Sequence, residues 1–271
     1  MPINQHSSPE QKIRLFRSLF QGRDDVFAQR FESQRTGRTG YSPACANEWL
    51  RGICDKPRVR CAKCEHRKLL PITDSVVRAH LTGGNQSGKS FVVGLYPMLL
   101  DETCHLLAID LDGKHWRKDA IALWATCQRL EVPVALEVSR SGNGAHLWFF
   151  FSEAVPARLA RTLGSHLLTE TMEEHPGIGF ESYDRLFPNQ DTLPKGGFGN
   201  LIALPLQGDA RKAGNSVFVD ERFDPHRDQW AFLAGIQRLS LADLQALAHH
   251  AAVKGRVVGI RMPPEEDSSE E

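Results

Sequence analysis

The chain has 271 residues, of which 41% are hydrophobic and 24% charged, and its 33 lysines and arginines balance its 33 aspartates and glutamates. Such a composition is typical of a soluble globular protein, and this length predicts one large domain with a small accessory one. No apolar run is long enough to cross a membrane, and the first residues lack the apolar stretch of a signal peptide, so we expect a cytoplasmic protein without a membrane segment.

Hydrophobic periodicity predicts helices and strands along most of the chain. Apolar residues recur at near-helical spacing over Pro9–Phe31, with a break around Gly22, which predicts a first amphipathic helix. Further on, the pattern predicts a helix at 74–81, strands at 91–100, 104–111, 132–138 and 145–151, helices at about 117–130 and 156–174, strands at 200–207 and 215–220, and helices near 226–236 and 240–252. This order predicts an α+β or mixed fold with a central sheet.

Charge is distributed unevenly along these elements. Residues 1–79 contain 15 lysines and arginines against 8 acids, whereas five of the last seven residues are acidic. A basic segment of this kind is typical of a surface that contacts nucleic-acid phosphates, and an acidic tail of low hydrophobicity predicts disorder. The even overall balance therefore does not exclude a nucleic-acid-binding protein.

Residues 36–68 form a Gly-, Cys- and Arg-rich segment with little apolar periodicity. This predicts a small loop-rich module that needs a stabilising cross-link, because it has too few apolar residues for a core. Its four cysteines, spaced C-x8-C-x6-C-x2-C, predict a structural Zn²⁺ site, because two thiolates two residues apart can bind one ion. Buried free thiols are the alternative. The predicted zinc ligands are Cys45, Cys54, Cys61 and Cys64.

Seven lysines and arginines surround these four cysteines, so a folded module would display a basic surface that suits phosphate contacts. A merely solvated basic face is the alternative. Cys104 and Cys127 lie instead within apolar strand and helix patterns, which predicts that both belong to the core.

Residues 83–90, GGNQSGKS, match the phosphate-loop pattern G-x4-G-K-[ST] at every defined position. A phosphate loop follows a strand and opens a helix, whereas here a helical pattern precedes the motif and a strand pattern follows it. Because this order is reversed, we interpret the segment as a Gly- and Ser-rich hairpin loop rather than as an NTPase motif.

Asp110 and Asp112 stand two residues apart in the segment His105–Gly113, at the end of an apolar run that predicts a buried strand. Residues i and i+2 of a strand share one face, so both carboxylates project the same way. Two like charges side by side favour a cation, and Mg²⁺ or Mn²⁺ takes carboxylate oxygens and brings phosphate-bearing substrates with it. A turn or helix cap is the alternative for an isolated pair of this kind.

A polar, glycine-containing loop precedes the strand that carries His146. Glycines let a backbone approach an anion closely, and the loop adds hydroxyl, amide and guanidinium donors, which is phosphate-binding chemistry. A lone His at a strand start is more often structural, yet one next to an Asp-x-Asp strand is well placed to bind a triphosphate. The donors of the loop are Ser139, Arg140, Ser141 and Asn143.

Four long segments resemble the archaeo-eukaryotic primase superfamily, and most closely the primase domain of helicase-associated TOTE conflict systems. They are VGLYPMLLDETCHLLAIDLDG, EVSRSGNGAHLWFFF, SYDRLFPNQDTLPKGGFGNLIALPLQ and GNSVFVD, and the likeness extends over nearly the whole chain. The resemblance implies an α+β fold, with a primase-like catalytic core around a central mixed or antiparallel sheet. We expect a helical and zinc-binding module at 1–80, the primase-polymerase core at 81–255 and an acidic, disordered tail at 256–271.

The resemblance also implies roles for individual residues. Asp110 and Asp112 match the first acidic motif, and His146 with Ser141 or Ser139 matches the Ser…His motif. Asp184 is our choice for the third metal-binding acid. The competitors for that third role are Glu181 and Asp191. Contacts to the incoming nucleotide or template are expected from the loop Ser139, Arg140, Ser141 and Asn143 and from Arg185, Asn189, Gln190, Lys195 and Asn200, with a structural loop role as the alternative for any of the last five.

The activity that the resemblance implies is template-directed nucleotidyl transfer by a DNA primase or polymerase, with Mg²⁺ or Mn²⁺ as the catalytic metal. Its partners would be nucleoside triphosphates, a single-stranded DNA or RNA template with its primer, and a helicase or nuclease of the kind that TOTE proteins join to this domain. Two other classes stay open: a noncatalytic, zinc-containing nucleic-acid-binding module, and a metal-dependent nuclease, which also uses clustered acids.

Overall fold

The strands form two antiparallel sheets in the computed structural model, which describes residues 2–33, 36–84 and 90–253. The first sheet has the order β2-β1-β3-β8 and the second β7-β4-β6-β5-β9. The bounds are β1 Ala28–Glu32, β2 Thr39–Pro43, β3 Val93–Leu95, β4 Thr103–Asp112, β5 Ala135–Val138, β6 Gly144–Pro156, β7 Tyr183–Phe187, β8 Ile202–Ala203 and β9 Val217–Phe218. The predicted α+β class with a central antiparallel sheet is therefore confirmed.

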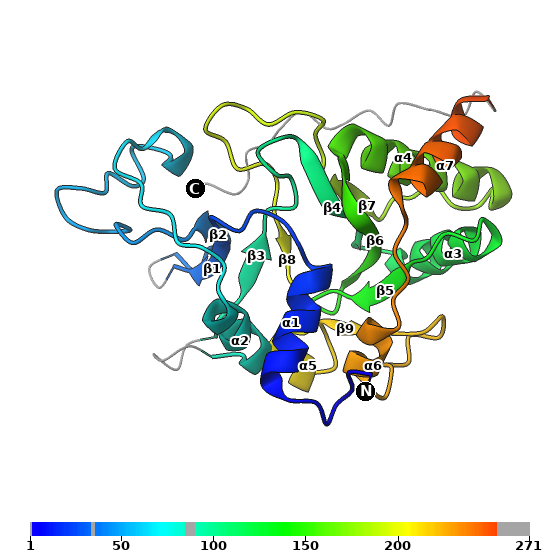
Figure 1. Ribbon diagram of the computed structural model, residues 1–271, viewed down its shortest axis with the longest axis horizontal. Coiled ribbons are helices and arrows are strands. Elements are labelled where there is room, and N and C mark those ends of the chain that lie inside the picture. Colours follow the sequence, from blue (N-terminus) through cyan, green and yellow to red (C-terminus); the bar gives the residue numbers. More distant parts are fainter. Residues whose placement is uncertain (1, 34–35, 85–89, 254–271) are drawn as a thin grey trace.

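Helices cover the second sheet on one face, while the first sheet lies across from its other face (Figure 1). α3 and α4 contact both β4 and β6, α7 contacts β6, and α1 stands in front of the two sheets. The helices are α1 Pro9–Leu19, α2 Asp74–Thr82, α3 Trp116–Arg129, α4 Ala157–Glu174, α5 Gly208–Lys212, α6 Gln229–Ala234 and α7 Leu241–Val253, with a short 3-10 helix at Cys61–Lys63. No helix in this described part is both long and apolar enough to span a membrane.

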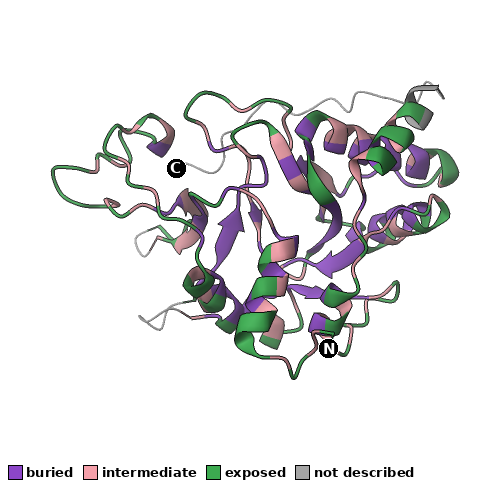
Figure 2. Ribbon diagram, in the orientation of Figure 1, coloured by how far each residue is buried: buried purple, intermediate pink, exposed green. Residues whose placement is uncertain are grey.

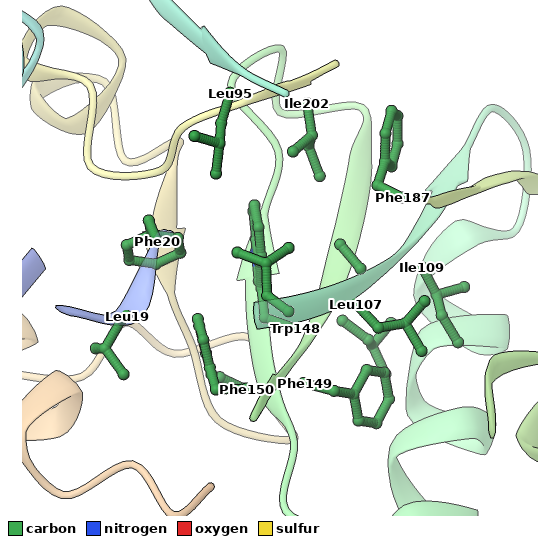
Figure 3. Close-up of a cluster of buried hydrophobic side chains, with 14 of the residues drawn as sticks. Leu19, Phe20, Leu95, Leu107, Ile109, Trp148, Phe149, Phe150, Phe187 and Ile202 are labelled. Atoms are coloured by element: carbon green, nitrogen blue, oxygen red, sulfur yellow. The ribbon is translucent and has the colours of Figure 1, made fainter. Parts of the chain in front are cut away.

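The core is built around the long central strands β4 and β6, whose residues are buried on both faces (Figure 2). Leu107 points toward α4, where it meets Gly164. On the opposite face the ring of Phe20 packs edge-on against Trp148 at 5.2 Å and Phe150 at 5.3 Å between ring centroids (Figure 3). α1 therefore closes the face of the sheet that carries the even-numbered residues of β6.

The first helix is shorter than its periodicity predicts. α1 begins at a Ser8 capping box and ends at Leu19, and Ala28–Glu32 forms strand β1 instead of a second helical half. At Gly22 an added Cβ would lie 2.3 Å from the carbonyl oxygen of Tyr96, so the chain passes too close to its neighbour to continue as a helix. Hydrogen bonding to β2 and β3 then overrides the helical pattern.

Other predicted elements are confirmed in kind but not always in length. The predicted strands at 91–100, 200–207 and 215–220 shorten to three, two and two residues in β3, β8 and β9. The phosphate-loop motif has α2 before it and β3 after it, which confirms the reversed order, although residues 85–89 lie outside the described part. Cys104 and Cys127 are fully buried, as predicted.

Backbone hydrogen bonds join the predicted modules. β1 and β2 share the first sheet with β3 and β8, so a boundary near residue 80 would divide a single sheet. The division into 1–80 and 81–255 stays a prediction, and the predicted acidic tail at 256–271 lies outside the described residues.

His80 of α2 ties the first sheet to the helix beneath it. Its side chain is fully buried, its Nδ1 accepts from the Val93 N–H at 3.1 Å, and its Nε2 donates to the Pro205 carbonyl at 3.0 Å. Burial lowers the pKa of His80 to about 4, despite the hydrogen bond to Pro205. The ring is therefore neutral in the folded protein at neutral pH, as the acceptor role of Nδ1 requires.

This histidine predicts an acid-sensitive contribution to stability. Because its folded pKa lies below the ordinary value of 6.5, the contribution is full above about pH 6.5 and is lost as the pH falls toward 4. Denaturant unfolding across this window should show a loss on the order of 3 kcal/mol, at about 1.4 kcal/mol per pKa unit, that is absent in His80→Gln. Equal pH slopes for the two proteins would contradict the assignment.

Candidate functional site

Asp110 and Asp112 lie on β4, the strand between β6 and β7 in the second sheet. Asp110 is paired directly with His146 of β6 on one side and with Arg185 of β7 on the other. Opposite residues of an antiparallel pair project to the same face, so one carboxylate, one imidazole and one guanidinium meet there. The Asp110 carboxylate approaches the His146 ring, with 3.4 Å between Oδ1 and Nε2.

The imidazole of His146 is held from behind by a second carboxylate that is fully buried. Glu137 of β5 accepts from His146 Nδ1 at 2.9 Å and from the Trp148 indole N–H at 2.7 Å, and its other oxygen accepts from Ser216 at 3.4 Å. Burial lowers the pKa of His146, but the charges of Glu137 and Asp110 outweigh burial and raise it to about 9. Glu137 therefore fixes the orientation of the ring, with Nε2 directed at Asp110, and the neighbouring acids favour the charged form of His146.

Asp184 enters the same group through an irregularity in β7. The register shifts between Asp110 and Leu111, whose partners are Arg185 and Tyr183, which leaves Asp184 as the extra residue of a bulge. Arg185 donates to Asp184 through Nε at 2.8 Å. Burial raises the pKa of Asp110 to about 6; His146 opposes this, and the nearby charges of Asp184 and Asp112 add to it. The three acids predicted to act together are thus electrostatically coupled.

Gly144 makes room for the second acid of the pair. It is the register partner of Asp112, and a Cβ at this position would lie 2.5 Å from Asp112 Oδ1 and 2.5 Å from the Leu111 carbonyl oxygen. Only a residue without a side chain allows this approach. Gly144 is thus required for the placement of the Asp112 carboxylate, a role that the sequence analysis missed.

The loop before β6 is a tight hairpin at the same edge of the sheet. The hydroxyls of Ser139 and Ser141 are 3.0 Å apart, and the Ser141 hydroxyl accepts from the Asn143 N–H at 3.2 Å. The Arg140 guanidinium lies beside the Tyr41 hydroxyl of β2, where it opposes the rise in the Tyr41 pKa that burial causes. The loop therefore reaches from the second sheet to the first.

Other predicted site residues are placed less centrally. The Asn200 amide donates to the Leu186 carbonyl at 2.9 Å and accepts from the Asn189 N–H at 3.3 Å, so both of its ends hold the loop after β7. Asp191 forms an ion pair with Arg161, and it is not among the charges that shift the pKa of Asp110. The amide nitrogen of Gln190 is buried without a partner in that loop. Six of the predicted site residues are exposed to solvent, namely Asp112, Ser141, Asn143, Glu181, Asp191 and Lys195.

The carboxylates of the predicted catalytic site and the thiols of the predicted zinc site are ligand types that suit divalent cations. In neither place do the described side chains converge closely enough to coordinate one ion. Among the described residues, no three His, Cys, Asp or Glu side chains stand close enough together to hold a metal. Asp110, Asp112 and Asp184 nevertheless bring hard carboxylate oxygens into one coupled group, which is the chemistry that Mg²⁺ and Mn²⁺ prefer. The four cysteines of the predicted zinc site line one small pocket.

Glu137 is the other residue that the sequence analysis missed. Its signal is a single acid in the apolar strand Ala135–Val138, where a buried charge requires partners. His146 and Trp148 on the neighbouring strand β6 supply those partners, together with Ser216.

Residues 11–247 match the model of the Archaeo-Eukaryotic Primase domain of TOTE conflict systems. The chain belongs to this family. Its membership confirms the resemblance seen in the sequence and indicates a primase-polymerase domain with nucleotidyltransferase activity, in a family that generally uses divalent metals. Among solved structures, the polymerase domain of Ligase D from Mycobacterium tuberculosis in complex with DNA matches at 12% identity with a TM-score of 0.36, over 92% of this chain and 90% of that one. No curated protein matches this TOTE primase domain.

The contact between Gly144 and Asp112 predicts the effect of one added methyl group. In Gly144→Ala, the Cβ would displace the Asp112 carboxylate or the strand, so we expect Mn²⁺ affinity, measured by calorimetric titration, to fall by about 10-fold or more. Overpacking should also lower stability by about 1–3 kcal/mol. Gly179→Ala is the matched control, because a Cβ there meets nothing within 4 Å. Wild-type Mn²⁺ affinity in Gly144→Ala would disprove this role.

Proposed function

We propose that this domain is a template-directed nucleotidyltransferase, a DNA primase or polymerase that joins nucleoside triphosphates on a single-stranded template. One observation carries the proposal: Asp110 and Asp112 share a face with the cationic His146, which Glu137 fixes from behind. A metal-binding acid pair beside a fixed cation suits a substrate that brings both a metal and phosphate charge. The family that residues 11–247 match supports the same activity.

In this proposal the acidic residues bind the metal ions, and His146 binds the phosphates of the substrate. Divalent ions held by Asp110, Asp112 and Asp184 would activate the attacking hydroxyl and neutralise the pyrophosphate leaving group. His146 presents its Nε2 to the β- and γ-phosphates, and because Glu137 holds the ring in one orientation, it supplies charge and position rather than a mobile proton.

The hairpin loop completes the phosphate site in this proposal. The Ser139 and Ser141 hydroxyls and the Asn143 amide are neutral donors, and Arg140 adds a positive charge between the two sheets. Arg185 and Lys195 are proposed to contact the incoming nucleotide or the template, whereas the contacts of Asn200 favour its structural role, and no contact decides between the two for Gln190. Nucleoside triphosphates, single-stranded DNA or RNA with its primer, and a separate helicase or nuclease are the proposed partners.

A structural zinc ion completes the proposal. Cys45, Cys54, Cys61 and Cys64 line one pocket, and the Lys68 N–H donates to the Cys45 sulfur at 3.3 Å, as backbone amides do to metal-bound thiolates. Zn²⁺ would draw the four thiols together and so cross-link the cysteine-containing segment, which has almost no hydrophobic core of its own.

Nucleotide incorporation tests the proposed activity. The protein, a primed single-stranded template, labelled nucleotides and Mn²⁺ should give extended products, and Asp110→Ala with Asp112→Ala should abolish them while the circular dichroism spectrum stays unchanged. Asp184→Asn should lose at least about 100-fold in rate, whereas the matched Asp191→Asn keeps most of the activity, because Asp191 is paired with Arg161. Shortened products would indicate a nuclease, and unaltered template would favour a noncatalytic binding module.

Metal analysis tests the zinc site separately. The protein purified without chelators should contain about one zinc per chain, and Cys61→Ser with Cys64→Ser should lose it and expose the segment to proteolysis. Cys104→Ala, at a buried thiol in β4, should keep its zinc. A wild-type protein without zinc, or a double variant that retains it, contradicts the site.

A further inference from the structure

Large apolar side chains that face solvent are concentrated on one part of the molecule, the cysteine module, which we define as residues 45–70. Trp49 is 68% exposed, and it is the one exposed tryptophan in the described chain. The module projects from the edge of the first sheet, and most of its residues are exposed (Figures 1 and 2). Five of the six exposed large hydrophobic residues of the described chain belong to it, namely Trp49, Leu50, Ile53, Val59 and Leu70. Such a cluster marks an interaction surface.

The backbone of the module holds Trp49 outward. Trp49 has a φ of +61°, a left-handed conformation that is unfavourable for a bulky side chain and persists only where the surroundings impose it. The turn is closed by the Leu50 N–H, which donates to the Asn47 carbonyl at 3.1 Å. The Asn47 side chain in turn donates to the His66 carbonyl at 2.6 Å. The indole is therefore presented to solvent by a turn that is anchored at both ends.

The surroundings of this indole are positively charged. Residues 45–70 contain seven lysines and arginines against three acids. Lys56 lies 5.8 Å from the centre of the Trp49 ring and also pairs with Glu48 at 2.9 Å, which neutralises one of the three acids. The basic residues that are exposed are Arg51, Arg58, Arg60, Lys63 and Lys68. A polyanion is therefore the ligand that fits the charge of this surface.

We propose that the cysteine module is a single-strand clamp, in which Trp49 stacks on a base while the surrounding cations contact the flanking phosphates. Nucleic-acid single strands are the one common polyanion whose units also carry flat aromatic faces, and every base can stack on an indole regardless of sequence. An acidic protein segment would meet the cations but would leave the large planar face of Trp49 without a matching group. The clamp rests on the proposed function, since the bound strand is the template of that reaction.

Contacts between the cysteine module and the loop after β7 connect the clamp to the strand that carries Asp184. Arg67 of the module donates to the Gly196 carbonyl at 2.9 Å, in the loop that follows β7. Phe198 of the same loop lies under the Arg67 guanidinium, 5.5 Å from ring centre to Cζ. β7 itself carries Asp184 and Arg185 beside Asp110. A strand seated on the module is therefore directed along this loop to the site.

Binding of a labelled oligonucleotide tests the clamp without catalysis. Fluorescence anisotropy with a 20-nucleotide deoxythymidine strand, without nucleotides or added Mg²⁺, should show that Trp49→Ala binds about 5- to 100-fold more weakly than the wild type. Trp49→Leu should show a similar loss, and Trp49→Phe should recover most of the affinity. Leu100→Ala is the matched control, because Leu100 is 70% exposed but lies outside the module.

An abasic strand of the same length separates stacking from charge. It should bind wild type and Trp49→Ala equally, because only phosphate contacts remain, and the salt dependence of the two proteins should agree. Unchanged affinity of Trp49→Ala for the deoxythymidine strand would overturn the proposal and leave the surface to a protein partner. Loss of affinity in Trp49→Phe, or the same loss on the abasic strand, would also overturn it, since either indicates a structural role for the residue.

The proposed function can fail without affecting this result. Asp110→Ala with Asp112→Ala should bind the deoxythymidine strand at least as tightly as the wild type, because without metal these two acids can only repel the phosphates. A clamp that binds strands in a protein without nucleotide incorporation would disprove the polymerase but keep the clamp. If the protein incorporates nucleotides but Trp49→Ala binds the strand as tightly as the wild type, the polymerase stands and the clamp is disproved.

Discussion

The negative charge on one face of β4 is the constraint on which the rest of the site depends. Asp110 is largely buried, and the charges of Asp112 and Asp184 add to the burial that raises its pKa to about 6. Such a group is stable only beside positive charge, and the fold supplies this from both neighbouring strands, through His146 of β6 and Arg185 of β7. In the proposed function, divalent metal ions would supply further positive charge at this face of the sheet.

The core explains how these charges stay in place. Trp148 is fully buried between Phe20, at the end of α1, and the strands of the sheet, and its indole N–H completes the hydrogen bonding of Glu137. Glu137 therefore links the packing of the apolar core to the orientation of His146. The bulge that places Asp184 and the missing side chain of Gly144 are the two further adjustments that bring three acids to one face.

Much of this arrangement could be predicted from the sequence, because it depends on local patterns. The alternation along β4 put Asp110 and Asp112 on one face, and the glycine-containing loop pointed to His146. Glu137 and Gly144 could not be assigned this way, since their roles arise from cross-strand register, which links residues 9 and 32 positions apart from their partners His146 and Asp112. Only the second half of the helix expected over Pro9–Phe31 was wrong, and for the same reason, because pairing with Val93 made Gln29 part of a strand.

The central claim is that divalent ions held by Asp110, Asp112 and Asp184 activate the attacking hydroxyl, and such an ion would also contact the α-phosphate that this hydroxyl attacks. Incorporation of the two diastereomers of an α-phosphorothioate nucleotide tests it most directly, since Mg²⁺ binds oxygen far better than sulfur and softer ions tolerate sulfur. We expect one diastereomer to be used poorly with Mg²⁺ and to recover with Mn²⁺ or Cd²⁺. Equal use of both diastereomers with Mg²⁺, unaffected by the softer ions, would contradict a direct metal contact and with it the role assigned to Asp110 and Asp112.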